Sequence, residues 1–372
     1  MNTADDFVHT GPGTLPGRYM RTFWQPVYEA SKLAPERAVP LRIMSEDFTL
    51  YRGHSGKAHV VSPRCAHRGT RLSTGWVEDD CIRCFYHGWK YDASGQCVEM
   101  PAEDGAFPPK VRIRGYPTEE YLGLIFAYLG EGAPPSLPHY TDFEDEGVLE
   151  ASSYVRPCSY FNNVENQVDP VHLGFVHRAS AFSSAGLVGV PEVSASESDY
   201  GIELRAERPT GVRVSSFLMP TMINLKGSPE DAKETGWRDT LAWRVPIDDA
   251  QHHSFNVSLT HLHGEAAERY RQRRAQAPDP ATEVTELTER ILRGELRISD
   301  VQDHSALVNI QDNVAQIGQG VIANRIDERL GRSDAGVILL RKIWSRELQS
   351  LAEGTPLKQW IAPARVATTA GV

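Results

Sequence analysis

Two cysteines and two histidines lie in one short stretch of the chain, where they could jointly bind a metal centre. Cys65-Ala-His67 and Cys84-Phe-Tyr-His87 are separated by sixteen residues. Structural zinc sites usually draw on Cys–Cys and His–His pairs, whereas each pair here mixes the two residue types. The alternation suits a two-iron cluster in which one iron takes both thiolates and the other takes both imidazoles.

One local feature competes with this interpretation. Cys81-Ile-Arg-Cys84 is a CxxC pair that could begin a zinc ribbon, but a ribbon needs a second such pair and the sequence contains none. A two-iron cluster with histidine ligands has a reduction potential of roughly −150 to +300 mV, against about −400 mV for an all-cysteine plant-type cluster. Such a centre can pass single electrons to a stronger oxidant.

The stretch resembles the Rieske [2Fe–2S] motif, Cys-x-His followed by Cys-x-x-His. Matching extensions follow both pairs, Arg68-Gly69 after the first and Gly88-Trp89 after the second. The resemblance implies that Cys65 and Cys84 bind one iron of the cluster. It implies that His67 and His87 bind the other.

A second group of candidate ligands begins at Asp169. Asp169-Pro170 is typical of a helix start, with Asp as the N-cap and Pro at the first helical position. His172, three residues after Asp169, would share its helix face. His177 lies five residues further on, about 140° around a regular helix. Both imidazoles can reach one ion only if the helix widens or ends between them, which Gly174 would permit.

A carboxylate from elsewhere must complete such a site. Two imidazoles and one carboxylate on one side of Fe(II) leave the opposite side open for dioxygen and substrate. Residues 309–320 predict a buried helix, in which Asp312 would be an uncompensated charge unless it met a cation. The other carboxylates considered are Asp300, Asp303 and Glu328. A purely structural histidine pair, and a role for Asp169 as a cap alone, remain open.

The spacing Asp169-x-x-His172-x-x-x-x-His177, followed much later by Asp312, resembles the catalytic iron site of Rieske non-haem iron oxygenases. The resemblance implies that His172, His177 and Asp312 bind a mononuclear Fe(II). It implies rings of subunits in which one cluster faces the iron of its neighbour. Asp169 would then bridge the redox centres, accepting hydrogen bonds from His172 and from His87 of the next subunit.

The chain as a whole is long enough for two domains, with 372 residues of which 40% are hydrophobic. The expected fold is α+β: an all-β Rieske domain, then a catalytic domain with an antiparallel sheet covered by helices, of the helix-grip or START-like kind. The expected parts are a lead-in packing on the Rieske domain (1–37), the Rieske domain (38–132), a linker (133–153) and the mononuclear iron domain (154–372).

Local patterns place individual elements. The apolar residues of 19–27 could form a short helix, and Gly53 to Gly56 predict a hairpin turn. Alternation predicts catalytic-domain strands within 201–205, 222–225, 241–245 and 255–260. Helical spacing of apolar residues predicts helices over 281–292 and 337–348.

Charge and composition bear on partners and location. The net charge of −10 argues against a general nucleic-acid binder. The window 51–90 nevertheless holds seven basic and three acidic residues, so a docking patch for an acidic electron carrier around Arg68 and Arg71 competes with an ordinary solvated surface. The sequence has no export signal, and its longest apolar run, 122–129, is too short for a membrane span, so we expect a soluble cytoplasmic protein. Free thiols are expected at Cys81, Cys97 and Cys158.

Further matches, such as Trp24-Gln-Pro-Val27 and the run 243–249, resemble the phthalate-dioxygenase-like branch. This implies a terminal oxygenase (alpha) subunit, a mono- or dioxygenase forming homotrimers or stacked trimers. Because no nicotinamide or flavin motif is present, electrons would come from another protein, which the resemblance implies is a ferredoxin or a flavin/iron–sulfur reductase. The expected reaction uses O₂ to hydroxylate or O-demethylate an acidic or methoxylated aromatic compound. Arginines that could bind a carboxylate are Arg205, Arg213, Arg238 and Arg244.

Three alternatives remain beside this expectation. The first is a hydroxylase or N-demethylase of an alkaloid or another ring compound. The second is a Rieske electron-transfer protein without oxygenase activity, which would lack the second metal site. The third is a zinc-stabilised binding module, which would be colourless and redox-silent.

Overall fold

A computed structural model describes residues 6–104, 108–180, 182, 186–187, 189–227, 236, 238–277 and 280–366. The chain divides into two compact units. The N-terminal unit comprises His9–Leu137 and Val245–Asp248. The C-terminal unit comprises Met1–Val8, Pro138–Arg244 and Asp249–Val372.

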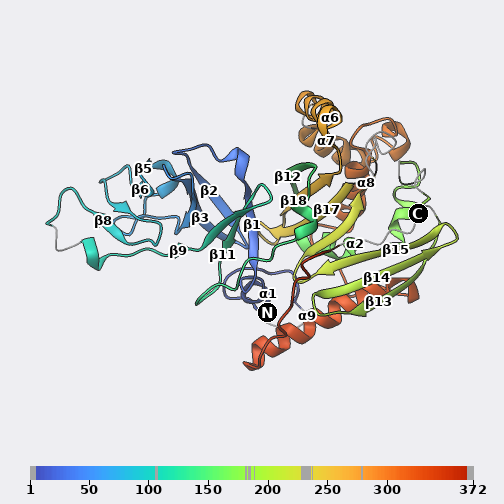
Figure 1. Ribbon diagram of the computed structural model, residues 1–372. Coiled ribbons are helices and arrows are strands. Elements are labelled where there is room, and N and C mark those ends of the chain that lie inside the picture. The colour runs from blue at the N-terminus through green and yellow to red at the C-terminus, as the bar shows by residue number, and fades with distance from the viewer. Residues whose placement is uncertain are drawn as a thin grey trace. The chain divides into compact units, whose positions relative to one another are not determined.

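The N-terminal unit is built from three small sheets, ordered β2-β3-β4-β9, β5-β6-β7-β8 and β1-β11-β10 (Figure 1). Its strands are β1 (Trp24–Glu29), β2 (Ala38–Ile43), β3 (Glu46–Arg52), β4 (Ala58–Val61), β5 (Trp76–Glu78), β6 (Cys81–Arg83), β7 (Lys90–Tyr91), β8 (Cys97–Glu99), β9 (Gly115–Tyr116), β10 (Thr118–Tyr121) and β11 (Leu124–Tyr128). Short 3₁₀ turns lie at Ala30–Lys32, Leu72–Thr74 and Pro108–Lys110. The predicted hairpin turn at 53–56 joins β3 to β4.

The start of this unit differs from the helix expected over 19–27. Helix α1 (Leu15–Met20) ends early, and Trp24–Glu29 forms β1, which pairs antiparallel with β11. Pro26 lacks a backbone N–H and cannot sit inside a helix, and the pairing register shifts beside it, between Pro26 and Tyr28. The expected lead-in thus supplies a strand to the first unit.

The N-terminal unit also takes in a segment from much later in the chain. Met44 N–H donates to the Pro246 carbonyl (2.8 Å), and Ser45 N–H donates to the Ile247 carbonyl (2.9 Å). Both donors have left-handed backbone, at φ +50° and +60°, and their successive N–H groups reach the successive carbonyls at the end of β17. The unit is therefore discontinuous in sequence.

The C-terminal unit centres on a seven-stranded sheet in the order β12-β18-β17-β16-β15-β14-β13. Its strands are β12 (Val148–Arg156), β13 (Glu192–Glu197), β14 (Gly201–Arg208), β15 (Gly211–Leu218), β16 (Met222–Gly227), β17 (Arg238–Pro246) and β18 (His252–Thr260). The four predicted strands fall within β14, β16, β17 and β18. Burial alternates along β14, as its sequence does, whereas Leu241–Pro246 of β17 is buried throughout. Residues 148–153, expected in the linker, form the first part of β12.

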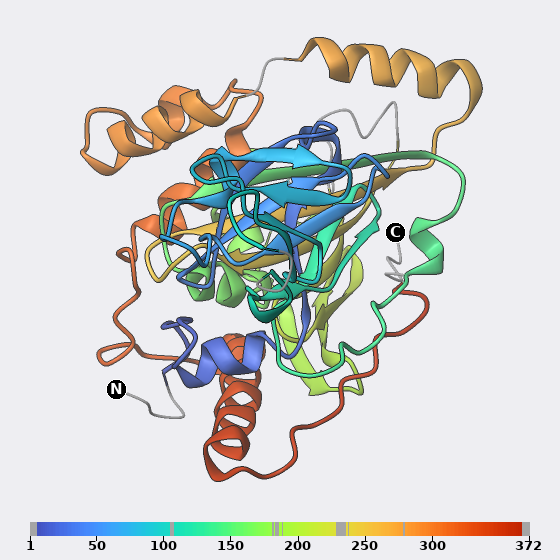
Figure 2. The same ribbon diagram turned by 90° about the vertical axis from the view of Figure 1, so that its left-hand side faces the viewer.

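Helices complete this unit. They are α2 (Tyr160–Gln167), α3 (His172–Phe175), α6 (Gly264–Gln276), α7 (Ala281–Leu292), α8 (Leu307–Ile317) and α9 (Ala335–Glu353), with 3₁₀ turns at Thr141–Phe143, Ile298–Val301 and Arg332–Asp334. The helices predicted over 281–292 and 337–348 are α7 and α9. Helix α9 packs along the β13–β14 end of the sheet (Figures 1 and 2). The expected α+β fold is confirmed.

No helix among the described ranges is both long and apolar enough to cross a membrane.

Candidate metal centres

The two cysteine–histidine loops have the same backbone hydrogen bonds. Cys65 N–H donates to the Thr70 carbonyl (2.9 Å), and Gly69 N–H donates to the Cys65 carbonyl (3.0 Å). In the second loop, the equivalent bonds run from Cys84 to Trp89 (2.9 Å) and from Gly88 back to Cys84 (3.0 Å). Each loop thus closes through a bond to the fifth residue after its cysteine.

The two glycines of these loops explain why the turns can be so tight. Gly69 and Gly88 have φ of +76° and +74°, a left-handed conformation that residues with a Cβ rarely adopt. The resemblance had identified both glycines without giving their role.

The cysteines face inward and the histidines outward. Cys65 and Cys84 are 4% and 1% exposed and belong to the same core as Tyr91, while His67 and His87 are exposed with ring centroids 4.4 Å apart. The Tyr91 hydroxyl lies 3.2 Å from Cys65 Sγ. Burial raises the pKa of the Cys84 thiol, and the adjacent Cys65 raises it further. Two neighbouring buried thiols and two neighbouring surface imidazoles fit a cluster with one iron per pair.

Of the other cysteines, Cys97 lies in the same core as Cys65 and Cys84. All five cysteines are free, as expected for Cys81, Cys97 and Cys158. Cys97 Sγ contacts the Glu99 carbonyl at 3.6 Å, and Cys158 is fully buried.

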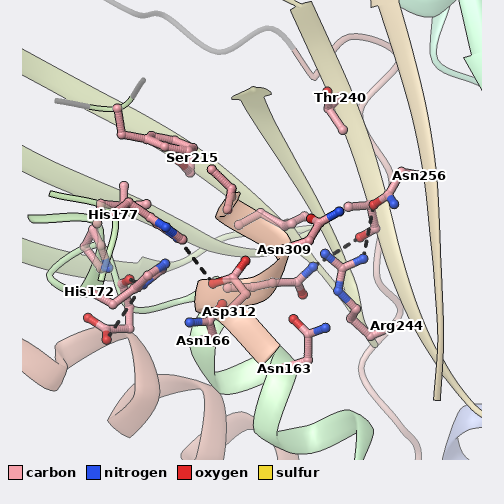
Figure 3. A pocket seen from close by; sticks show the side chains of 18 of the residues that line it. Asn163, Asn166, His172, His177, Ser215, Thr240, Arg244, Asn256, Asn309 and Asp312 are labelled. Carbon is pink, nitrogen blue, oxygen red and sulfur yellow. Dashed lines mark hydrogen bonds and ion pairs between the residues drawn. The ribbon is translucent and has the colours of Figure 1, made fainter. Parts of the chain in front are cut away.

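Three side chains of the C-terminal unit converge on a second candidate centre. One ligand atom from each of His172, His177 and Asp312 can be chosen so that all lie within 4.8 Å of one another. His177 Nε2 lies 3.3 Å from Asp312 Oδ1. Figure 3 shows the three side chains pointing toward one another at one end of a pocket. These are the residues that the sequence pattern selected.

The chain between the histidines is shaped as their spacing requires. Helix α3 begins at His172 and ends at Phe175, so His177 lies beyond its end. Gly174 lets the backbone at Gly189 come close to this segment, because a Cβ at position 174 would lie 2.6 Å from the Gly189 carbonyl oxygen. The break in the helix brings both imidazoles to one side.

The outer nitrogen of each imidazole has a hydrogen-bond acceptor. His177 Nδ1–H donates to Gln311 Oε1 at 2.9 Å, and His172 Nδ1–H donates to the backbone carbonyl of Asp169. With Nδ1 protonated, Nε2 of each ring keeps its lone pair for a metal ion. Sequence analysis missed Gln311; its only signal was its place beside Asp312.

Asp169 differs in detail from its expected role. Its Oδ1 accepts a hydrogen bond from Val171 N–H (2.9 Å), so it caps the turn that precedes α3. Its Oδ2 lies 3.9 Å from His172 Nδ1, while the backbone oxygen of the same residue takes the hydrogen bond. The expected carboxylate–imidazole hydrogen bond within the chain is thus replaced by a backbone one.

The charge environment favours a cation between these side chains. Burial alone would raise the pKa of Asp312, but contact with His177 and the charges of His177, Arg156 and His172 outweigh it and lower that pKa to about 2. Asp312 Oδ1 is buried and faces His177 Nε2 at 3.3 Å. A buried carboxylate that converges with two imidazoles fits an Fe(II) site.

The other carboxylates considered lie elsewhere. Asp300 accepts the Arg297 backbone N–H (2.9 Å), Asp303 is exposed, and Glu328 pairs with Arg341 (2.5 Å). None of them joins the histidine pair.

A cavity of ≈ 400 Å³ opens beside the candidate iron site. Of the four candidate arginines, Arg213, Arg238 and Arg244 line it, whereas Arg205 is exposed and pairs with Glu207 (2.6 Å). Arg244 is only 8% exposed; it donates to Asn256 Oδ1 (3.3 Å), and its Nε has no hydrogen-bond partner among the described residues. Figure 3 shows Arg244 and Asn256 at the end of the pocket opposite His172.

Known proteins resemble this chain over most of its length. The model of the Rieske [2Fe-2S] domain matches residues 23–117. The chain is 31% identical to the 5,5'-dehydrodivanillate O-demethylase oxygenase subunit of Sphingobium sp. (strain NBRC 103272 / SYK-6), over 94% of this chain and 80% of that protein. It is 30% identical to the phenoxybenzoate dioxygenase subunit alpha of Ectopseudomonas oleovorans, over 92% and 84%.

Solved structures share the fold. The terminal oxygenase of carbazole 1,9a-dioxygenase from Novosphingobium sp. KA1 superposes with a TM-score of 0.67 at 19% identity, covering 88% of this chain and 92% of that one. The oxygenase in its reduced complex with ferredoxin, from carbazole 1,9a-dioxygenase, gives 0.65 at 19% identity, covering 90% and 93%. The chain belongs to the Rieske non-haem iron oxygenases, as a terminal oxygenase subunit that uses a [2Fe–2S] cluster and a mononuclear iron.

Proposed function

We propose that this oxygenase acts on an aromatic carboxylate, which it hydroxylates or O-demethylates. The observation that carries the proposal is the pocket itself, in which a buried guanidinium, Arg244, faces the convergence of His172, His177 and Asp312. A buried arginine with an unused donor is a strong partner for a planar carboxylate. The printed names of two relatives, an O-demethylase and a phenoxybenzoate dioxygenase, agree with this substrate class.

In the proposed site, His172, His177 and Asp312 hold the iron. Bound iron supplies the oxidising power by activating O₂ with electrons from the cluster held by Cys65, His67, Cys84 and His87. Gln311 and the Asp169 carbonyl keep Nδ1 of the two imidazoles protonated. Arg244 and Asn256 would anchor the substrate at the far end of the pocket, so that its ring or methoxy group faces the iron.

The arginines that line the pocket favour an acidic substrate over the alternative, an alkaloid or another ring compound. Arg213 is largely desolvated, which lowers its pKa to about 10. An anionic substrate offsets the cost of burying guanidinium groups, whereas a cationic alkaloid would add to it.

We further propose that Asp169 joins the cluster of one subunit to the iron of the next within a homotrimer or stacked trimers. Its Oδ2 lies 3.9 Å from His172 Nδ1, and its side chain is 29% exposed, so a second partner could reach it; in the proposal this partner is His87 of the neighbouring subunit. Asp169→Asn should keep both metals while abolishing coupled turnover. Normal turnover in this variant would refute the bridge.

A ferredoxin or a flavin/iron–sulfur reductase would supply electrons at the first cluster loop. In the window 51–90, Arg83 and Lys90 pair with acidic neighbours, whereas Arg68 and Arg71 are exposed. Arg68→Glu and Arg71→Glu should slow cluster reduction by an acidic ferredoxin at low salt, with the difference shrinking as salt rises. Equal rates at low salt would sink this docking surface.

The function is tested first by metal content. Anaerobically purified protein should contain three irons and two acid-labile sulfides per chain, and Asp312→Ala should contain two of each. Oxygen uptake is then screened with paired aromatic acids and their methyl esters. Arg244→Met should raise KM for the acid at least about tenfold, the usual scale for a charged hydrogen bond, and leave the ester unaffected. Equal use of acid and ester by the unmodified protein would reject the carboxylate subsite.

A further inference from the structure

A fully buried arginine lies behind the helix that carries Asp312. Arg156, the last residue of β12, is 1% exposed. Its Nε donates to Asn313 Oδ1 (2.7 Å), and one terminal nitrogen donates to Gln316 Oε1 (2.5 Å). The other terminal nitrogen lies 3.4 Å from the Tyr154 hydroxyl. Two of these acceptors belong to α8, so Arg156 fastens that helix to the sheet.

All of these acceptors are neutral. No carboxylate in the described part of the chain lies within ion-pair distance of Arg156. A buried charge without a counter-charge is costly, so a carboxylate at somewhat longer range must balance it. His252 lies opposite Arg156 where β12 pairs with β18. Burial, and then the charge of Arg156, hold the pKa of His252 well below the ordinary value, so its ring is neutral and supplies no counter-charge.

Asp312 is the carboxylate placed to balance Arg156. It directly precedes Asn313 on α8, and Gln311 and Asn313 flank it by about 100° on either side of the helix. Gln311 faces His177, and Asn313 faces Arg156. Asp312 thus lies on α8 between the residue that contacts His177 and the residue that contacts Arg156, and the charge of Arg156 is among those that lower the Asp312 pKa.

We propose that Arg156 is a positioning residue for the mononuclear iron, which fixes the turn of α8 presenting Asp312 and whose positive charge favours ferrous over ferric iron. The inference rests on the proposed ligand set. A fixed cation destabilises the more highly charged ferric state more than the ferrous state, and burial keeps water from screening it.

The effect of the Arg156 charge can be tested separately from its hydrogen bonds to α8, because aspartate has nearly the same shape as Asn313. Asn313→Asp keeps an oxygen acceptor for Arg156 Nε and adds a negative charge beside it. At one applied potential, the ferric-to-ferrous ratio of the mononuclear iron should rise at least about tenfold, which is the scale of effect expected for one unit charge in a protein interior. Arg156→Met should shift the ratio the same way and lose iron faster to a chelator, while Arg156→Lys should keep the ratio closer to that of the unmodified protein.

The matched control lies just beyond the end of the same helix, two residues after Ile317. Gln319 is exposed, and its Nε2 donates to the Ala315 carbonyl (3.4 Å). Gln319→Glu adds the same charge in solvent, where salt screens it, so the ratio should stay unchanged. The ratio is read from the ferric signal of the mononuclear iron by electron paramagnetic resonance, and cluster absorption checks that each variant has folded.

The outcomes separate this inference from the proposed function. Iron-loaded Asn313→Asp with an unchanged ratio overturns the role of the charge, whatever happens to Arg156→Met. A shift in Gln319→Glu as large as in Asn313→Asp also overturns it. If the unmodified protein binds no iron beyond its cluster, or if Asp312→Ala keeps that iron, the proposed ligand set itself is wrong.

Discussion

The two metal centres are specified in opposite ways. The four cluster ligands lie between residues 65 and 87 on two loops with matching hydrogen bonds, and each loop closes within its own residues. The three candidate iron ligands lie between residues 172 and 312, and they meet only because α8 packs against the segment after α3. The first centre depends on local turns, whereas the second depends on the packing of the whole C-terminal unit.

This contrast predicts that the centres fail independently. Cys84→Ala should abolish the cluster completely, with loss of its visible absorption and both sulfides. Mononuclear iron, added back anaerobically, should still bind to the C-terminal unit, because its three candidate ligands all belong to that unit and Cys84 does not. Iron and sulfide analysis measures both. Loss of both kinds of iron would show that the centres are not independent.

A change at Gly174 should damage only the second centre. A Cβ 2.6 Å from the Gly189 carbonyl oxygen forces backbone to move, so Gly174→Ala should destabilise the C-terminal unit by about 1–3 kcal/mol. Mononuclear iron should be lost to a chelator at least about tenfold faster, while cluster absorption persists. Gly13→Ala is the control, since a Cβ there meets no atom within 4 Å. Unchanged iron retention in Gly174→Ala would contradict the tertiary origin of the site.

The two loop glycines offer a matched pair within the first centre. Both occupy left-handed backbone, so alanine at either should cost about 1–2 kcal/mol. A Cβ at Gly88 would also lie 3.0 Å from Pro101 Cγ, whereas one at Gly69 meets no atom within 4 Å. Gly88→Ala should therefore lower the midpoint of thermal cluster loss more than Gly69→Ala. The reverse order would mean that the loops are less alike than their hydrogen bonds indicate.

The smallest effect is expected far from both centres, where β13 meets α9. Glu197 accepts hydrogen bonds from Arg346 and Lys358, which lower its pKa from 4.5 to about 2. A depressed folded-state pKa stabilises the fold above the unfolded value, and this gain is lost as pH falls from about 4.5 through about 2. Glu197→Gln should thus cost about 0.5 kcal/mol near neutral pH and nothing at the acid end. Urea unfolding at several pH values checks this, and a pH-independent cost would point to packing instead. Metal content should not change.

The same contrast between local turns and long-range packing decides which features could be predicted from the sequence. Turns and periodicity depend on neighbouring residues, so the hairpin at 53–56 and the helices α7 and α9 were predictable. Resemblance supplied Asp312, which spacing alone could not select among several carboxylates. Gln311 and Arg156 act through contacts across more than a hundred residues, and no local pattern reports such contacts. Trp24–Glu29 was misassigned because its apolar residues suit a short helix, while its partner β11 lies about a hundred residues away.

Because Val245–Asp248 belongs to the N-terminal unit, recombination between related oxygenases cannot exchange that unit as one continuous segment. A chimera joined once, after Leu137, would bring in a foreign first unit but keep the native Pro246 and Ile247, whose carbonyls accept the N–H groups of Met44 and Ser45. Two backbone donors would then depend on a mismatched acceptor. Because the two units meet at four points along the chain, exchange of one whole unit needs crossovers after Val8, Leu137, Arg244 and Asp248, so the two units are inherited together more readily than apart.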